Sequence, residues 1–177
     1  MEPRLICLIG AECTGKTTLA QALATQMGAL WVPEYLRSFT EQHARTPQRG
    51  EQAHILQEQV RLEAAALVTA RQQEKSLVFC DTAPLLTAIY SDCVFADHSL
   101  YAVGSALHAR YALTLLLEPD MPWVPDGLQR DGAAMRTRVH ERISSELAAL
   151  AAPYVWIAGS ASQRLASATA AVLSATV

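Results

Sequence analysis

The stretch LIGAECTGKTTLA, residues 8–20, decides the fold class of this 177-residue chain. Between Gly10 and Thr17 it has the pattern G-x-x-x-x-G-K-T, which follows the apolar run Leu5–Ile9 and leads into a helix-compatible run, Thr17–Met27. In a loop of this kind, backbone N–H groups bind phosphate oxygens, and the start of the following helix adds the positive end of its dipole. Strand, loop and helix in this order predict a P-loop that binds a nucleotide.

The residues of this loop have distinct expected roles. A Cβ at Gly10 or Gly15 would block the backbone conformation or the phosphate. Lys16 is expected to reach the β- and γ-phosphates as a catalytic residue, and the Thr17 hydroxyl to coordinate Mg²⁺. Cys13 is either a reactive thiol beside a helix N-terminus or an ordinary small residue, and we favour the second interpretation. ATP is the expected nucleotide, and its predicted binding residues are Gly10, Ala11, Glu12, Cys13, Thr14, Gly15, Lys16, Thr17 and Thr18.

The rest of the chain alternates between apolar runs and helix-compatible segments. Five apolar runs predict strands: Leu5–Ile9, Leu30–Val32, Leu77–Cys80, Leu113–Leu117 and Tyr154–Ile157. Several of these runs are apolar at nearly every position, which is typical of parallel strands covered on both faces. Helices are predicted over Thr17–Met27, Glu51–Glu74, Ala134–Ala151 and Ser162–Ser174. The pattern predicts an α/β P-loop NTPase fold over residues 1–177, a single domain with a five-stranded parallel sheet flanked by helices.

The composition of the chain argues against a nucleic-acid or membrane partner. The formal net charge is −3 and the pI about 5.9, whereas a general nucleic-acid binder usually carries a basic excess. No run of about 18 apolar residues occurs, so no transmembrane helix is expected. The four cysteines form no CxxC pair, and the five histidines have no metal-ligand spacing. We therefore predict a cytoplasmic, reduced protein without a nucleic-acid or membrane partner, and the sequence leaves its oligomeric state open.

Two acidic residues follow predicted strands and are candidate catalytic residues. Glu34, in WVPEYLR, is expected to take the proton of an acceptor hydroxyl, to hydrogen-bond the acceptor's sugar, or simply to begin a helix. Asp81 follows four apolar residues in LVFCD, a Walker B-like pattern, and is expected to hold Mg²⁺ through water or to act as the base. The sequence does not choose between Glu34 and Asp81 as the base.

The segment Glu118–Gly132, EPDMPWVPDGLQRDG, contains three prolines and two glycines and follows the fourth predicted strand. It is therefore predicted to be a loop at the carboxyl edge of the sheet, where ligands bind in open α/β sheets. Small-molecule kinases carry a lid in this place, and Arg130 and Arg136 are predicted catalytic residues that neutralise charge on the transferred phosphoryl group. Trp123 is either a packing plug or a stacking surface, and Asp126 is a candidate partner for the acceptor.

Five stretches of the chain can be compared together with known families. They are GAECTGKTTLAQALA (10–24), VPEYLR (32–37), FCDTAPLLTAIYSD (79–92), LLLEPDMPWVPDGLQRDG (115–132) and PYVWIAGSASQRLASA (153–168). In this order they resemble the kinase domain of NadR-type nicotinamide riboside kinases, and the resemblance covers nearly the whole chain. It implies ATP-dependent phosphorylation of the 5′-hydroxyl of nicotinamide riboside, giving nicotinamide mononucleotide.

The resemblance also implies a set of substrate contacts. The riboside has a flat cationic ring, on which Trp123 or Tyr35 would stack. Glu34 and Asp126 would balance the charge of the ring and hold the hydroxyls of the sugar. Gln59, on a predicted helix, matches a glutamine of the family and is expected to reach the acceptor.

The chain departs from the family's pattern at two positions. Cys13 stands where the family usually has a small hydroxyl residue, and Ala83 where it often has a polar one. The resemblance implies that the loop Gly159–Arg164 borders the adenine. Larger NadR proteins also carry an adenylyltransferase domain; no HxGH-like motif occurs in this sequence, so we expect a stand-alone kinase.

Three other classes of P-loop protein share the phosphate-loop motif and differ in the further features that they require. A regulatory GTPase needs an Asn-Lys-x-Asp motif to bind guanine, and the sequence contains no asparagine. A motor or remodelling ATPase usually adds a helical subdomain and acts in rings, which fits a chain of this length poorly. Two alternatives stay open: a P-loop kinase for another nucleoside or small hydroxyl acceptor, such as a sugar acid, and a stand-alone ATPase of regulatory function.

Overall fold

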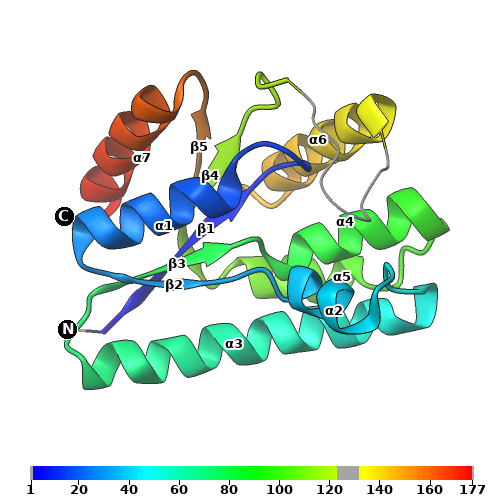
Figure 1. The fold of residues 1–177 in the computed structure, drawn as a ribbon, viewed down its shortest axis with the longest axis horizontal. Helices are drawn as coiled ribbons and strands as arrows, with labels where there is room; N and C mark the ends of the chain where they lie inside the picture. The colour runs from blue at the N-terminus through cyan, green and yellow to red at the C-terminus, as the bar shows by residue number, and fades with distance from the viewer. Residues whose placement is uncertain (1, 123–131, 177) are drawn as a thin grey trace.

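The computed structural model of the chain describes residues 2–122 and 132–176. Five strands form one parallel sheet in the order β2-β3-β1-β4-β5, with helices on both faces (Figure 1). The strands are β1 (Arg4–Ile9), β2 (Leu30–Val32), β3 (Leu77–Asp81), β4 (Tyr111–Leu117) and β5 (Tyr154–Ile157). The helices are α1 (Lys16–Met27), α2 (Tyr35–His43), the 3₁₀ turn η1 (Arg49–Glu51), α3 (Gln52–Gln72), α4 (Pro84–Phe95), α5 (Tyr101–His108), α6 (Gly132–Ala149) and α7 (Ala161–Thr176). The predicted α/β fold is confirmed.

Two apolar layers cover the sheet, and the central strand β1 contributes to both. Leu5, Cys7 and Ile9 face one layer, and Ile6 and Leu8 face the other, as the alternation of side chains along a strand requires. Helices α3, α4 and α6 close the first layer, while α1 and α7 close the second (Figure 1). Because β1 is buried on both faces, its sequence has no polar positions between Leu5 and Ile9.

The parallel register gathers the functional stretches at one edge of the sheet. Leu8 of β1 pairs with Asp81, the last residue of β3, and Val32 at the end of β2 pairs with Cys80. Strand β4 lies on the other side of β1. All of these strands run in the same direction, so the loops that follow them leave from one edge, where ligands bind in folds of this type.

The structure adds three helices to the four that the sequence analysis named: α2, α4 and α5. Helix α4 buries eight of its twelve residues, so no stripe of polar positions marks it as a helix. It begins at Pro84, a residue whose fixed φ suits the first turn of a helix. Within the described residues, no helix is long and apolar enough to cross a membrane.

Candidate active site

The loop between β1 and α1 has the backbone that its sequence predicts. A Cβ on Gly10 would lie 2.8 Å from the Thr14 hydroxyl oxygen and 3.0 Å from the Leu117 carbonyl oxygen, so only glycine fits there. Gly15 has φ 80°, the left-handed region that glycine adopts without strain. Cys13 also lies in the left-handed region, with φ 53°, although it has a side chain. These two left-handed residues curl the loop around the start of α1.

Lys16 extends from the first turn of α1 back across this loop. Its ammonium lies 3.0 Å from the carbonyl oxygen of Gly10 and 3.1 Å from that of Ala11. Backbone carbonyls thus hold the charge at the mouth of the loop, where the outer phosphates of a nucleotide would lie.

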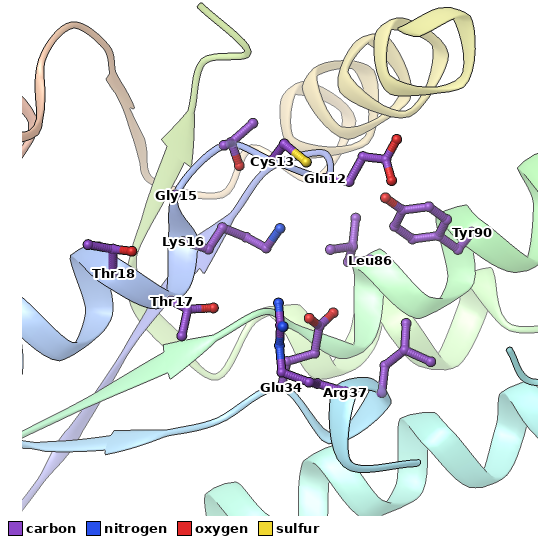
Figure 2. Close-up of a pocket in the computed structure, with 12 residues that line it drawn as sticks. Glu12, Cys13, Gly15, Lys16, Thr17, Thr18, Glu34, Arg37, Leu86 and Tyr90 are labelled. Carbon is purple, nitrogen blue, oxygen red and sulfur yellow. The ribbon is translucent and has the colours of Figure 1, made fainter. Parts of the chain in front are cut away.

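A cavity of about 220 Å³ opens in front of the loop. Figure 2 shows Lys16 pointing into it from α1, and Glu34 and Arg37 from the start of α2 on the opposite side. Leu86 and Tyr90 of α4 form a further part of its wall. Most of the predicted nucleotide-binding residues line the cavity, namely Glu12, Cys13, Thr14, Gly15, Lys16, Thr17 and Thr18.

Thr17 and Asp81 come from different elements but meet beside this cavity. The Thr17 hydroxyl donates to Oδ2 of Asp81 at 2.5 Å. Asp81 is 1% exposed, and its Oδ1 has no hydrogen-bond partner among the described residues. A hydroxyl beside a carboxylate with an oxygen to spare is a ligand set that suits Mg²⁺. The two predicted metal ligands therefore fit this ion, and no cluster of three or more His, Cys, Asp or Glu forms another metal site in the described part of the chain.

The chain turns sharply directly after Asp81. Thr82 has φ 86°, a conformation that β-branched residues rarely adopt. Its N–H donates to the carbonyl oxygen of Leu8 at 3.0 Å, which ties the turn to β1. Strained backbone of this kind concentrates at functional sites, and here it fixes the direction in which the chain leaves Asp81.

Two more hollows extend the first cavity away from the phosphate loop. One, of about 450 Å³, shares Glu12, Leu36 and Tyr90 with it and reaches the segment between α2 and η1. The other is small, at about 20 Å³, and is lined in part by Glu34 and Gln59. The larger hollow has a volume typical of small-molecule sites.

The structure gives several predicted residues unexpected contacts. The Tyr35 hydroxyl lies 3.3 Å from Nε2 of His54, and the Tyr35 N–H donates to Oε1 of Gln59 at 2.9 Å. Arg136, on α6, donates to the carbonyl oxygens of Met121 at 2.9 Å and Cys13 at 3.2 Å. Arg136 therefore binds the backbone of the phosphate loop at Cys13. The predicted residues Trp123, Asp126 and Arg130 lie outside the described residues.

Arg37 and Arg164 were not predicted as functional residues. Arg37 could have been predicted from the sequence, because it follows the candidate residue Glu34 by three positions, and residues three apart lie on the same face of a helix. Arg164 gave no such signal, because its partners are far away in the sequence. Its guanidinium donates to the carbonyl oxygens of Gly159 at 2.8 Å, Thr14 at 2.9 Å and Glu118 at 2.9 Å.

Arg164 thus joins three loops at the edge of the sheet. It is 3% exposed and also forms an ion pair with Asp120. The Gly159 N–H donates to Oδ2 of Asp120 at 2.6 Å, and this bond, with the charge of Arg164, lowers the pKa of Asp120. The phosphate loop, the end of β4 and the loop after β5 are held together by this one cluster.

An apolar cavity of about 290 Å³ lies on the other side of the phosphate loop, between α1 and α7. Leu19, Ala22 and Leu165 contribute to its walls, and it also contacts Gly15 and Met121. Its place beside the loop after β5 agrees with the adenine position that the family resemblance implies.

Two buried cysteines lie on strands next to the site, and their thiols favour the protonated form. Cys7 and Cys80 are fully buried in the layer under α3 and α4, and burial raises the pKa of both thiols. A buried thiol with a raised pKa is seldom a thiolate, and the thiolate is the form that acts as a nucleophile.

This fold and site define a P-loop nucleotide-binding domain. A family model described as an AAA domain matches residues 5–164, and the chain belongs to that family. The trifunctional NAD biosynthesis/regulator protein NadR of Salmonella typhimurium is 23% identical over 144 residues, which are 81% of this chain and 35% of that protein. The chain thus spans about a third of the length of its curated relative.

Solved structures with this fold include several kinases. A crystal structure of a NadR protein in complex with NR matches 99% of this chain and 52% of that chain, with a TM-score of 0.79 and 21% identity. The deoxyadenosine kinase from M. mycoides matches 96% of this chain and 99% of that chain, with a TM-score of 0.66 and 11% identity. The thymidylate kinase from Ehrlichia chaffeensis matches 100% of both chains, with a TM-score of 0.67 and 14% identity. The predicted P-loop NTPase fold is confirmed, and so is the predicted resemblance to NadR proteins.

Proposed function

We propose that this chain is an ATP-dependent kinase that phosphorylates the 5′-hydroxyl of nicotinamide riboside, giving nicotinamide mononucleotide. One observation carries the proposal: Glu34 and Arg37 of α2 face Lys16 of the phosphate loop across a single cavity. A hydrolytic ATPase needs only water at that point, whereas this cavity continues into a hollow large enough for a small molecule. The NadR structure in complex with NR supports the choice of riboside.

ATP would bind along the phosphate loop. Its triphosphate would accept from the loop's N–H groups and from Lys16, and its adenine would enter the apolar cavity between α1 and α7. Thr17 and Asp81 would hold Mg²⁺, which neutralises charge on the phosphates when it is bound. Because Asp81 already accepts from Thr17, we assign it to the metal rather than to proton transfer.

Glu34 would then be the acceptor-side carboxylate. It would orient the 5′-hydroxyl toward the γ-phosphate and receive its proton as the new P–O bond forms, while the bond from the γ-phosphorus to the β,γ-bridging oxygen breaks and ADP leaves. The transition state of phosphoryl transfer is loose, so positioning matters more than early proton removal. Lys16 and Arg37 would flank the transferred group and balance its charge, aided by the predicted lid residue Arg130.

The nicotinamide ring would occupy the larger hollow. Tyr90 lines both that hollow and the first cavity, and it offers a flat surface for a cationic ring. Glu12, which also lines both, adds negative charge. Trp123 and Asp126 stay predicted ligands of the ring and the sugar, while the hydroxyl of Tyr35 lies beside His54.

The test is a comparison of acceptors at a fixed ATP concentration. We expect kcat/KM for nicotinamide riboside to exceed that for deoxyadenosine and for thymidine monophosphate by at least about 100-fold, because a site built to pair with a substrate's groups rejects analogues that lack them. Mass spectrometry of the product identifies what was phosphorylated. A higher kcat/KM for either of the other two acceptors would replace the riboside with that acceptor class.

A further inference from the structure

The helix that carries Glu34 toward the cavity is capped by a residue of another helix. The first N–H groups of a helix have no acceptor within it, and the N-cap side chain often accepts from them. Glu34 occupies the N-cap position of α2, yet in the described structure its side chain makes no capping hydrogen bond. The N–H of Tyr35, the first residue of α2, donates to Oε1 of Gln59, on α3, at 2.9 Å.

Gln59 is in turn fixed by a second buried group. It is 2% exposed, and its Nε2 lies 3.4 Å from Oε1 of Glu63, one turn further along α3. Only one orientation of the amide serves both contacts, because its oxygen must face the N–H of Tyr35 and its nitrogen the carboxylate. Both ends of the Gln59 side chain therefore contact protein groups, which leaves it poorly placed to bind a substrate.

Glu63 anchors this arrangement to the sheet. Its side chain is 0% exposed and accepts from the hydroxyl of Tyr111 at 2.8 Å and from Arg110 at 2.8 Å. A buried carboxylate is costly unless it is paired, so these donors hold it in place. Tyr111 begins β4, which lies beside β1 in the sheet. The chain of contacts thus runs from the sheet through Glu63 and Gln59 to the start of α2.

We propose that Gln59 and Glu63 are positioning residues: Gln59 accepts from the first N–H of α2, and Glu63 holds Gln59, so that together they fix the start of α2 and with it the Glu34 carboxylate beside the cavity. The inference rests on the proposed function, in which Glu34 receives the proton of the acceptor. It replaces the expectation that Gln59 reaches the acceptor directly.

The first test compares two substitutions on α3. Gln59→Met removes both polar ends at nearly constant length, and Gln57→Met makes the same change at an exposed position two residues earlier. We expect Gln59→Met to lower kcat for nicotinamide riboside by on the order of 10- to 100-fold, because small displacements of a reacting group cost that much. The KM for ATP should change less than about twofold, since the triphosphate would contact the phosphate loop and the adenine the cavity between α1 and α7, neither of which includes Gln59. Gln57→Met should match the wild type.

A second readout does not depend on activity. Hydrogen exchange of the Tyr35 amide should become at least about tenfold faster in Gln59→Met, because the amide loses its acceptor, and should not change in Gln57→Met. If Gln59→Met does not fold, Gln59→Asn keeps the amide but shortens it by one methylene. We expect the same loss of protection and of kcat from that variant.

Unchanged exchange at Tyr35 in a folded Gln59 variant would overturn the inference, and so would a loss of ATP affinity equal to the loss of kcat. A wild-type protein that phosphorylates no riboside would contradict the proposed function instead. In that case, faster exchange at Tyr35 would still support the capping of α2 by Gln59.

Discussion

The Lys16 ammonium is the positive charge that the phosphate loop supplies to the cavity. It donates to two uncharged oxygens, the carbonyls of Gly10 and Ala11. A phosphate is a much stronger partner for an ammonium than a carbonyl is, so we expect Lys16 to move onto the nucleotide when ATP binds.

This assignment predicts the effect of Lys16→Ala. Phosphoryl transfer should fall by about 10²- to 10³-fold, as is usual when one donor to the transition state is removed. The free energy of unfolding should change by less than about 1 kcal/mol, because the side chain is only half-buried. Single-turnover kinetics and urea unfolding measure the two quantities.

Lys75→Ala, at the chain's other lysine, is the matched control for this change. It should leave phosphoryl transfer at the wild-type rate. Near-normal transfer in Lys16→Ala would contradict the phosphate site.

Residues whose roles depend on local spacing could be predicted from the sequence. Lys16 and Thr17 belong to one motif, and Asp81 ends an apolar run, so each was placed by its immediate neighbours. The role of Gln59 could not be predicted in this way. Its hydrogen bond to Tyr35 joins residues 24 positions apart, and only the packing of α2 on α3 brings them together.

At the scale of elements, the strands were easier to predict than the helices. β1 is apolar from Leu5 to Ile9, and β4 is apolar except at Thr114, because both faces are covered, and these runs are visible in the sequence. Helix α4 is buried nearly all round, so its sequence lacks the period that reveals α1 or α3 as helices. The segment Glu118–Gly132 was predicted as a loop, and α6 begins at its last residue.

Helix α5 is joined to β4 by a buried histidine. Nε2 of His108 lies 2.9 Å from the Thr114 hydroxyl, and its Nδ1 has no hydrogen-bond partner within residues 2–122 and 132–176. Burial, with a smaller contribution from the charge of Arg110, lowers the pKa of His108 to about 4. The folded protein therefore keeps this ring neutral at pH values where the unfolded chain protonates it.

This histidine predicts a pH dependence of stability. Between about pH 6.5 and pH 4 the unfolded chain binds the proton and the folded protein does not, so the free energy of unfolding falls as the pH falls through this window. The contribution of His108 to that fall is roughly 3 kcal/mol, and it levels off below pH 4. Urea unfolding at a series of pH values measures it.

His108→Gln keeps a group that can bond Thr114 but does not titrate. We expect this variant to lose less stability than the wild type between pH 6.5 and pH 4, whereas His54→Gln, at an exposed position, should follow the wild-type curve. Identical curves for wild type and His108→Gln would show that His108 is not held neutral by the fold.

At the scale of the whole molecule, the site exists because four strands end at one edge. The phosphate loop follows β1, Glu34 follows β2, Asp81 ends β3, and Glu118 follows β4. Arg164 and Arg136 then tie the phosphate loop to the chain after β4. The sequence predicted this edge from the order of its elements. It did not predict Arg164 as a site residue, and it predicted Arg136 as a catalytic residue and not as a link between loops, because both bind backbone carbonyls far away in the chain.

The central claim is that the γ-phosphate of ATP passes to a riboside and not to water. The most direct measurement incubates the protein with ATP labelled in its γ-phosphate, with and without nicotinamide riboside, and follows where the label goes. We predict that ATP is consumed slowly without the riboside, and that with it nearly all of the label appears in nicotinamide mononucleotide. Label that accumulates only in inorganic phosphate, at the same rate with and without the riboside, would contradict the account.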